Sequence, residues 1–193
     1  MINTLTLESP PGSLGAEEEK LIIEAARQDV DAFARLYHAY VQTIYHYLYS
    51  RVGQARTAED LTSQVFLEAL ESLPRYRHRG FFRAWLFSIA RHRMLNYHQR
   101  RPPEVGIEAV EDLPTPGADP LSQVIHGEEI AGLVHAIQGL KEDDRELLRL
   151  RYVAELSFSE IGMLLKRREG AVKKQLYRLL ARLKSQMEDP RES

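Results

Sequence analysis

Apolar residues recur at helical spacing along most of the chain. Between positions 33 and 48 they fall at i, i+3, i+4 and i+7, which predicts one long amphipathic helix that ends at Gly53. A second helix is predicted from a capping box, Thr57 followed by Asp60, to the residue before Pro74. Its core stripe is predicted to comprise Leu61, Val65, Ala69 and Leu73. A further helix is expected over residues 82–100.

The pattern changes between residues 102 and 120. This stretch holds five of the nine prolines, five acidic residues and no Lys or Arg, which predicts an extended acidic linker. Helical spacing resumes near Leu121 and continues to Met187 in four pieces, and no strand-like alternation of useful length occurs. We therefore expect an all-α fold of two small helical domains. The expected parts are a flexible leader (1–16), the first domain (17–101), the linker (102–120) and the second domain (121–188).

The second domain contains a predicted helix-turn-helix. Ser157 followed by Glu160 predicts a capping box that opens a short helix, and a three-residue basic turn separates it from a helix that begins near Glu169. The buried stripe of that last helix is predicted to comprise Val172, Leu176, Leu179 and Leu183. Basic and aromatic residues near its start are predicted to lie on another face, where a major groove would be contacted: Lys173, Lys174, Tyr177 and Arg178. The alternative is a helical hairpin with a solvated basic face.

Charge is concentrated in the first domain. The chain has a formal net charge of -2, yet residues 72–103 contain eight arginines, six aromatic residues and no acidic residue. Arginine neutralises phosphates and aromatic rings stack on unpaired bases, so this stretch predicts a surface for separated nucleic-acid strands. Trp85 is expected in the core, Tyr76 and Phe81 are expected to be available for stacking, and Phe82 is compatible with either place.

The composition excludes several classes of protein. Among 193 residues there is no cysteine, and no apolar run approaches the roughly 20 residues of a membrane-spanning helix. The start of the chain lacks the order of a signal peptide, so a soluble, cytoplasmic protein is expected. No catalytic triad or phosphate-binding glycine loop occurs, and His92 and His98 are not at metal-binding spacing. We expect no enzyme activity, no cofactor and no metal.

Two sets of motifs, in this order, resemble the extracytoplasmic-function (ECF) class of bacterial RNA polymerase sigma factors, within the sigma-70 family. The first domain resembles the family's second domain through DAF (31–33), LY (36–37), AEDLT (58–62), QVFL (64–67), FRAWLF (82–87) and IAR (89–91). The second domain resembles the family's fourth domain through LL (147–148), LRY (150–152), SEI (159–161), EG (169–170) and VK (172–173).

The resemblance implies a protein that binds the polymerase core at its largest-subunit clamp and its flap, recognises promoter −10 and −35 elements, and promotes melting of the DNA. It also implies an anti-sigma factor as a partner. The implied core-binding residues are Asp60, Gln64, Leu67 and Glu71. The implied −10 residues are Arg75, Arg77, Arg79, Phe82, Arg83, Arg91, Arg93, Asn96 and Arg100. The implied −35 residues, which would bind duplex DNA, are Arg168, Lys173, Lys174, Tyr177 and Arg178.

The chain also departs from the family pattern. Lys166 stands in the turn where glycine is common, so a left-handed backbone there would be mildly strained. Two other functions compete with the sigma factor. A dimeric helix-turn-helix repressor or activator would leave the basic residues 72–103 without a role. A sigma-like decoy that binds only a partner protein predicts loss of the basic residues in both domains, and here they are retained.

Overall fold

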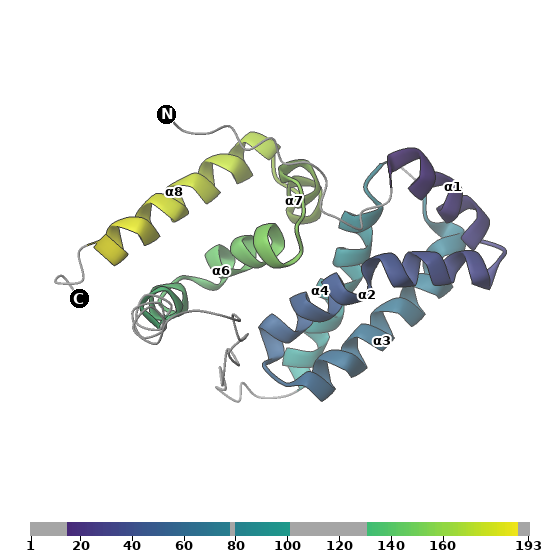
Figure 1. Cartoon of the computed structure of the whole chain (residues 1–193), viewed down its shortest axis with the longest axis horizontal. Helices are drawn as coiled ribbons and strands as arrows, with labels where there is room; N and C mark the ends of the chain where they lie inside the picture. Colours follow the sequence, from purple (N-terminus) through teal and green to yellow (C-terminus); the bar gives the residue numbers. More distant parts are fainter. Residues whose placement is uncertain (1–14, 78–79, 101–130, 189–193) are drawn as a thin grey trace, which may run out of the picture.

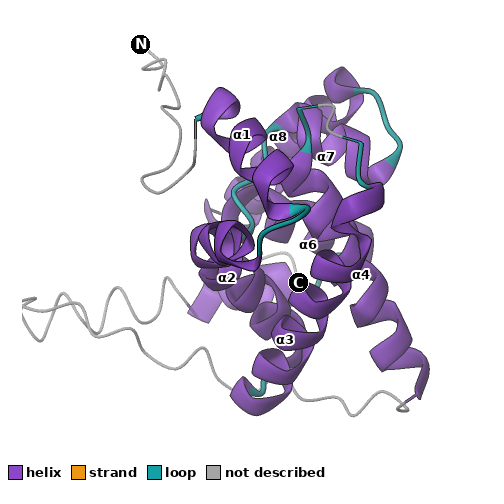
Figure 2. Cartoon of the chain, turned by 90° about the vertical axis from the view of Figure 1, so that its right-hand side faces the viewer, coloured by secondary structure: helices purple, strands orange, loops and turns teal. Residues whose placement is uncertain are grey.

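The computed structural model describes residues 15–77, 80–100 and 131–188, and all regular structure in these ranges is helical (Figures 1 and 2). The expected linker, most of the leader and residues 121–130 lie outside the described residues. Four α-helices form an N-terminal unit: α1 (Ala16–Ala26), α2 (Val30–Val52), α3 (Ala55–Ser72) and α4 (Phe82–Arg100). A short 3-10 turn, η1 (Leu73–Arg75), follows α3.

A C-terminal unit begins with a helix over residues 131–138. It continues through α6 (Glu142–Leu148), a π-helical turn η2 (Arg149–Val153), α7 (Phe158–Leu165) and α8 (Glu169–Glu188). The breaks expected near Gly139, after η2 and between α7 and α8 are all present. Figure 1 shows the N-terminal unit at the right and the C-terminal unit at the left, with α6 and α7 turned toward α2 and α4.

Local signals set most of the helix ends. Gly53 adopts φ 68°, and its N–H donates to the carbonyl oxygen of Tyr49 at 2.8 Å, which closes α2 as expected. Asp29 caps the start of α2 by accepting from the N–H of Asp31 at 2.9 Å. The sequence pattern gave no sign of this break between α1 and α2. The predicted Thr57–Asp60 capping box is wrong, because α3 already begins at Ala55 and no side-chain cap forms there.

The helix-turn-helix has the predicted geometry. Ser157 accepts from the Glu160 N–H at 3.2 Å and donates its own N–H to the Glu160 carboxylate at 2.7 Å, so the capping box is confirmed. Lys166 adopts φ 55°, the left-handed conformation that the turn was expected to require. Gly162 lets the turn close, since a Cβ there would lie 2.7 Å from the carbonyl oxygen of Arg167.

The two units share one hydrophobic core. The predicted stripes of α3 and α8 are buried, and α2 contributes Leu36, Ile44 and Leu48 at 0–1% exposure. Side chains of the C-terminal unit belong to the same cluster of buried residues: Leu147, Leu150, Ala154, Leu156, Ile161, Val172 and Leu176. The sequence predicted two small helical domains on a linker. In the structure they pack against each other.

Candidate nucleic-acid interface

The start of α8 presents an exposed basic surface. Lys173, Lys174, Tyr177 and Arg178 are all exposed, and Arg168 is exposed just before the helix begins. The stripe from Val172 to Leu183 points the other way and is at most 5% exposed. The four exposed residues of α8 line a shallow hollow together with two small neighbours. The lining residues are Gly170, Lys173, Lys174, Tyr177, Arg178 and Ala181. The structure thus brings the predicted residues of the last helix together on one face.

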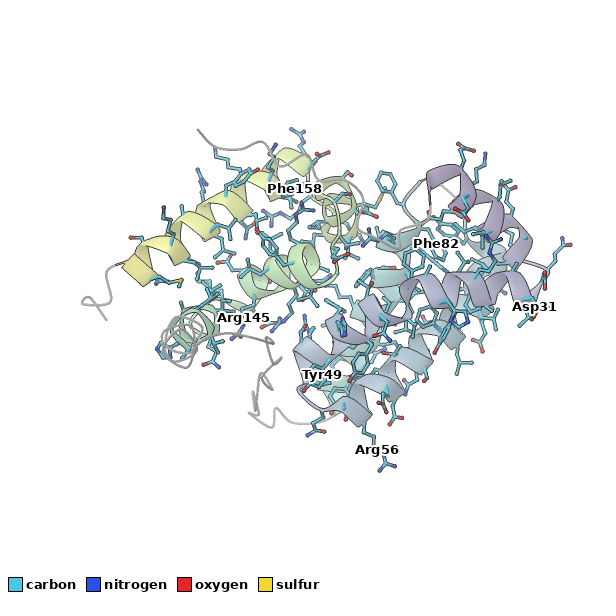
Figure 3. All side chains as sticks on the ribbon, in the orientation of Figure 1. Asp31, Tyr49, Arg56, Phe82, Arg145 and Phe158 are labelled. Atoms are coloured by element: carbon cyan, nitrogen blue, oxygen red, sulfur yellow. The ribbon has the colours of Figure 1, made fainter. Side chains whose placement is uncertain are left out.

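A pair of rings supports this surface. The ring centroids of Phe158, which is labelled in Figure 3, and Tyr177 are 6.3 Å apart, and the Lys173 ammonium lies 5.9 Å from each. The Arg151 guanidinium lies 4.8 Å from the centroid of Phe158. Such cation–π contacts hold long basic side chains in place. Sequence reasoning missed Phe158 and Arg151 as parts of this surface, although an aromatic residue at the first position of the short helix was visible.

The outer face of α3 is a separate surface. Asp60, Gln64, Leu67 and Glu71 are all exposed, and the Leu67 side chain is 60% exposed. The opposite face of α3 carries the buried stripe, so these four residues follow from the helical period. This face of α3 therefore combines one exposed leucine with acidic and amide side chains.

The predicted −10 residues are dispersed. Arg75 and Arg77 are exposed beside the start of α4, whereas Arg79 and the Arg100 side chain lie outside the described part of the chain. Arg93 forms an ion pair with Glu68 of α3. The amide of Asn96 lies 3.4 Å from the His92 ring nitrogen.

Phe82 does not lie on a surface. Phe82, which is labelled in Figure 3, is 2% exposed. Its ring centroid is 5.7 Å from that of Tyr40, 5.6 Å from that of Tyr76 and 5.3 Å from that of Trp85. This aromatic packing closes the end of the N-terminal unit at the start of α4. A ring held there cannot stack on a base without leaving the core, so Phe82 is removed from the candidate −10 set.

Arg83 and Arg91 face the C-terminal unit. Arg83 donates through Nη2 to the carbonyl oxygens of Ala154 at 2.9 Å and Glu155 at 3.2 Å. Arg91 lies with its Nε 3.6 Å from a carboxylate oxygen of Glu146. Two arginines predicted to bind DNA therefore bind acceptors of the same chain. The sequence offered no signal for this pairing.

Glu146 is the centre of the contact between the units. It is 5% exposed, accepts from the Tyr47 hydroxyl at 2.7 Å, and is paired with Arg51. Burial raises the pKa of Tyr47 well above its usual range, and the Glu146 charge raises it further, so the hydroxyl remains a donor. Burial opposes the charge on Arg51, but Glu146, Tyr47 and Glu142 together outweigh burial and raise the pKa of Arg51.

The described residues offer no group of three or more His, Cys, Asp or Glu side chains that could hold a metal ion. Among the helices that the structure describes, none is long and apolar enough to cross a membrane.

Comparison with known proteins gives a consistent match. The model for "Sigma-70 region 2" matches residues 36–102, and that for "Sigma-70, region 4" matches residues 130–183. The RNA polymerase sigma factor YlaC of Bacillus subtilis is 31% identical over 84% of this chain and 95% of its own length. The ECF RNA polymerase sigma factor BldN of Streptomyces coelicolor is 35% identical over 85% of this chain, which spans only 63% of BldN.

Two solved structures share the fold. CnrH, in complex with the cytosolic domain of CnrY, aligns with a TM-score of 0.64 at 19% identity, over 90% of this chain and 98% of CnrH. The sigma factor RpoE of Bartonella quintana, in complex with the anti-sigma factor NepR, aligns with a TM-score of 0.54 at 20% identity, over 91% of this chain and 97% of RpoE.

Proposed function

The chain belongs to the ECF class of RNA polymerase sigma factors in the sigma-70 family, and from this premise we propose that it directs core polymerase to promoters and promotes their melting. It binds the −10 element through its N-terminal unit and the −35 element through its C-terminal unit. Sigma factors are initiation factors and not themselves enzymes, so melting draws on binding energy. The protein acts in the cytoplasm, where polymerase is found.

One observation carries this proposal. Regions 2 and 4 follow each other in one chain, and the region 4 match ends in a helix whose basic face is exposed. The −35 set is Arg168, Lys173, Lys174, Tyr177 and Arg178. The −10 set, without Phe82, is Arg75, Arg77, Arg79, Arg83, Arg91, Arg93, Asn96 and Arg100. Arginine and lysine at the start of a recognition helix can donate to guanine acceptors in the major groove.

The partners follow from the same premise. The core polymerase is bound at its clamp by the α3 face and at its flap by the C-terminal unit. An anti-sigma factor is the proposed regulator. The complex of Bartonella RpoE with the anti-sigma factor NepR supports this proposal, because RpoE has the same fold as this chain. A decoy that binds only a partner protein is the competing function, and the retained basic surface of α8 argues against it.

The function is tested by reconstitution. Purified protein is added to core polymerase with a library of randomised promoters, and the 5′ ends of the transcripts are sequenced. The proposal predicts transcripts that start at a fixed distance from one shared pair of upstream elements. A decoy would bind core or a partner and yield no transcripts above the core-only control.

Leu67→Asp tests the polymerase-binding face. Placing a charge at an interface anchor should weaken association with core by about 2 kcal/mol. Folding should be little affected, because the side chain is 60% exposed. The matched control is Leu21→Asp on α1, where an equally solvent-facing leucine is 66% exposed. Equal core affinity for the two variants in a direct titration would remove α3 from the interface.

A further inference from the structure

The end of α1 reaches the segment that leads into α4. Arg27 follows the last residue of α1, and its Nη2 donates to the backbone carbonyl oxygen of Tyr76 at 2.6 Å. The two residues are 49 positions apart. Arg27 belongs to none of the motifs that identify the family, and the region 2 match begins only at residue 36. The contact therefore joins a residue outside the family match to one inside it.

Helix α1 gives Arg27 a fixed base. The helix packs against α2 through three side chains that are at most 4% exposed: Ile22, Ile23 and Ala26. The buried Glu19 carboxylate also accepts from the hydroxyl of Tyr40 in α2. Because these contacts hold α1 in the N-terminal unit, the Arg27 guanidinium approaches Tyr76 from an anchored helix.

Tyr76 is held by three contacts. Its N–H donates to the carbonyl oxygen of Leu73 in η1 at 3.0 Å, and its own carbonyl oxygen accepts from Arg27. Its ring centroid lies 4.6 Å from that of Trp85 and 5.6 Å from that of Phe82, both in α4. The ring expected to stack on bases is thus half-buried in aromatic packing. Among the three contacts, the bond to Arg27 is the one that comes from outside η1 and α4.

Exposed arginines flank this fixed residue. Arg75 and Arg77, both in the proposed −10 set, are exposed on either side of Tyr76. A backbone rotation at Tyr76 would move both of these side chains, so the contacts of Tyr76 limit where the two guanidinium groups can lie. Groups that are held in place before a ligand arrives lose less freedom on binding and select their ligand more sharply.

We propose that Arg27 is a positioning residue for the −10 set: it acts through the Tyr76 carbonyl to hold Arg75 and Arg77 for the separated strand. The inference rests on the proposed function for the identity of that strand, but the contact itself is measured without DNA. The competing role is a direct bond from the Arg27 guanidinium to a phosphate. A positioning residue changes the preference for the −10 sequence, whereas a phosphate contact weakens all sequences alike.

The first test uses the fluorescence of Trp85, the single tryptophan of the chain, whose ring packs against Tyr76. Arg27→Met keeps an aliphatic side chain and removes the donors, so Tyr76 should loosen and acrylamide should quench Trp85 more strongly than in wild type. Arg27→Lys keeps a charged donor and should restore the quenching of wild type. Circular dichroism checks that each variant is folded, which is expected because Arg27 is exposed.

The matched control is Arg35→Met on α2. Its Nη2 lies 3.1 Å from the Glu18 carboxylate of α1, and its side chain is 61% exposed. This change removes the same charge and one contact of α1, but no contact of Tyr76, so quenching should stay at the level of wild type. Equal quenching in wild type and Arg27→Met, or an equal rise in both methionine variants, would overturn the role of the Arg27–Tyr76 contact.

The second test measures binding of holoenzyme to two pre-melted templates, one with the −10 sequence found in the promoter-library assay and one with that sequence scrambled. Arg27→Met should lower the preference for the matched template roughly fivefold, as for the loss of one hydrogen bond, while Arg27→Lys and Arg35→Met keep it. The dependence of binding on salt should stay unchanged.

Two results of this second test would overturn the positioning role. One is an unchanged preference in Arg27→Met. The other is an equal loss of affinity for both templates with a salt slope lower by about one, which would identify a phosphate contact. Failure of the promoter-library assay would instead count against the proposed function, since the quenching test contains neither polymerase nor DNA.

Discussion

Helices α8 and α4 both carry clusters of basic residues, and they present them in different ways. On α8 a single buried stripe leaves the opposite side open, so Lys173, Lys174 and Arg178 share one exposed face. Helix α4 is buried around most of its circumference, with side chains at 7% exposure or less: Phe82, Ala84, Leu86, Phe87, Ile89, Ala90 and Met94. Its arginines emerge at the margins of that packing, and Arg83 and Arg91 meet the C-terminal unit there.

The difference teaches what a basic, aromatic-rich segment can and cannot indicate. Residue type predicts the chemistry that a surface offers, which is phosphate neutralisation and stacking in both helices. Whether a nucleic acid can reach those side chains depends on what else packs against the helix. The basic face of α8 is exposed, whereas part of the basic surface of α4 is occupied by acceptors of the same chain.

A substitution that unfolds the C-terminal unit, and with it the basic face of α8, should have the largest effect on stability. Leu176 is 1% exposed on α8, and Leu176→Asp should cost about 4 kcal/mol or more, because burial is lost and a charge is desolvated. Amide hydrogen exchange should show that α7 and α8 lose protection while α2 and α3 keep it. Ala181→Asp, on the exposed face of the same helix, is the control. Simultaneous loss of protection in both units would mean that they fold only as one cooperative body.

Changing the chemistry of the exposed face should have the next largest effect. A good contact to a base edge is worth about 1–3 kcal/mol of discrimination, so Arg178→Ala should relax the preference at one or two upstream positions. A contact to phosphate alone would weaken all sequences alike. The measurement is a selection of upstream sequences by holoenzyme carrying wild type, Arg178→Ala or Lys174→Ala. The same preference from all three would show that this face does not read bases.

The turn that positions α8 gives the smallest effect. Lys166 holds a left-handed conformation, so Lys166→Gly should stabilise the C-terminal unit by about 1 kcal/mol, seen as a higher midpoint of thermal unfolding. Sequence preference should stay as in wild type. The control is Gly170→Ala, which also changes the number of glycines but lies in the first turn of α8, where an added Cβ meets nothing within 4 Å. A lower midpoint for Lys166→Gly would contradict the strain inferred for this turn.

The sequence predicted best what short-range chemistry decides. The Gly53 helix end, the Ser157 capping box and the buried stripe of α8 all depend on neighbours within a few positions, and all are confirmed. The failed Thr57 cap is also local, but the sequence did not show that α3 begins at Ala55. These signals fixed the helices and the exposed faces of α3 and α8.

Long-range pairing could not be predicted in the same way. Glu146 and Tyr47 are 99 positions apart, and neither the acid nor the tyrosine is unusual in its own segment. Phe82 belongs to an aromatic-rich segment, and only its packing against Tyr40 and Trp85 places it in the core. Such contacts depend on how whole helices meet. No periodicity within one helix encodes them.

A direct test compares Arg83→Ala and Arg178→Ala in holoenzyme on two templates, a duplex promoter and the same promoter pre-melted at the −10 element. Arg83 acts on separated strands in the proposal, so its loss should weaken open-complex formation on the duplex more than binding to the pre-melted template. The loss of Arg178 should weaken binding to both templates alike, because the upstream element is duplex in each. Equal effects of Arg83→Ala on the two templates, or no effect on either, would contradict the division of labour between α4 and α8.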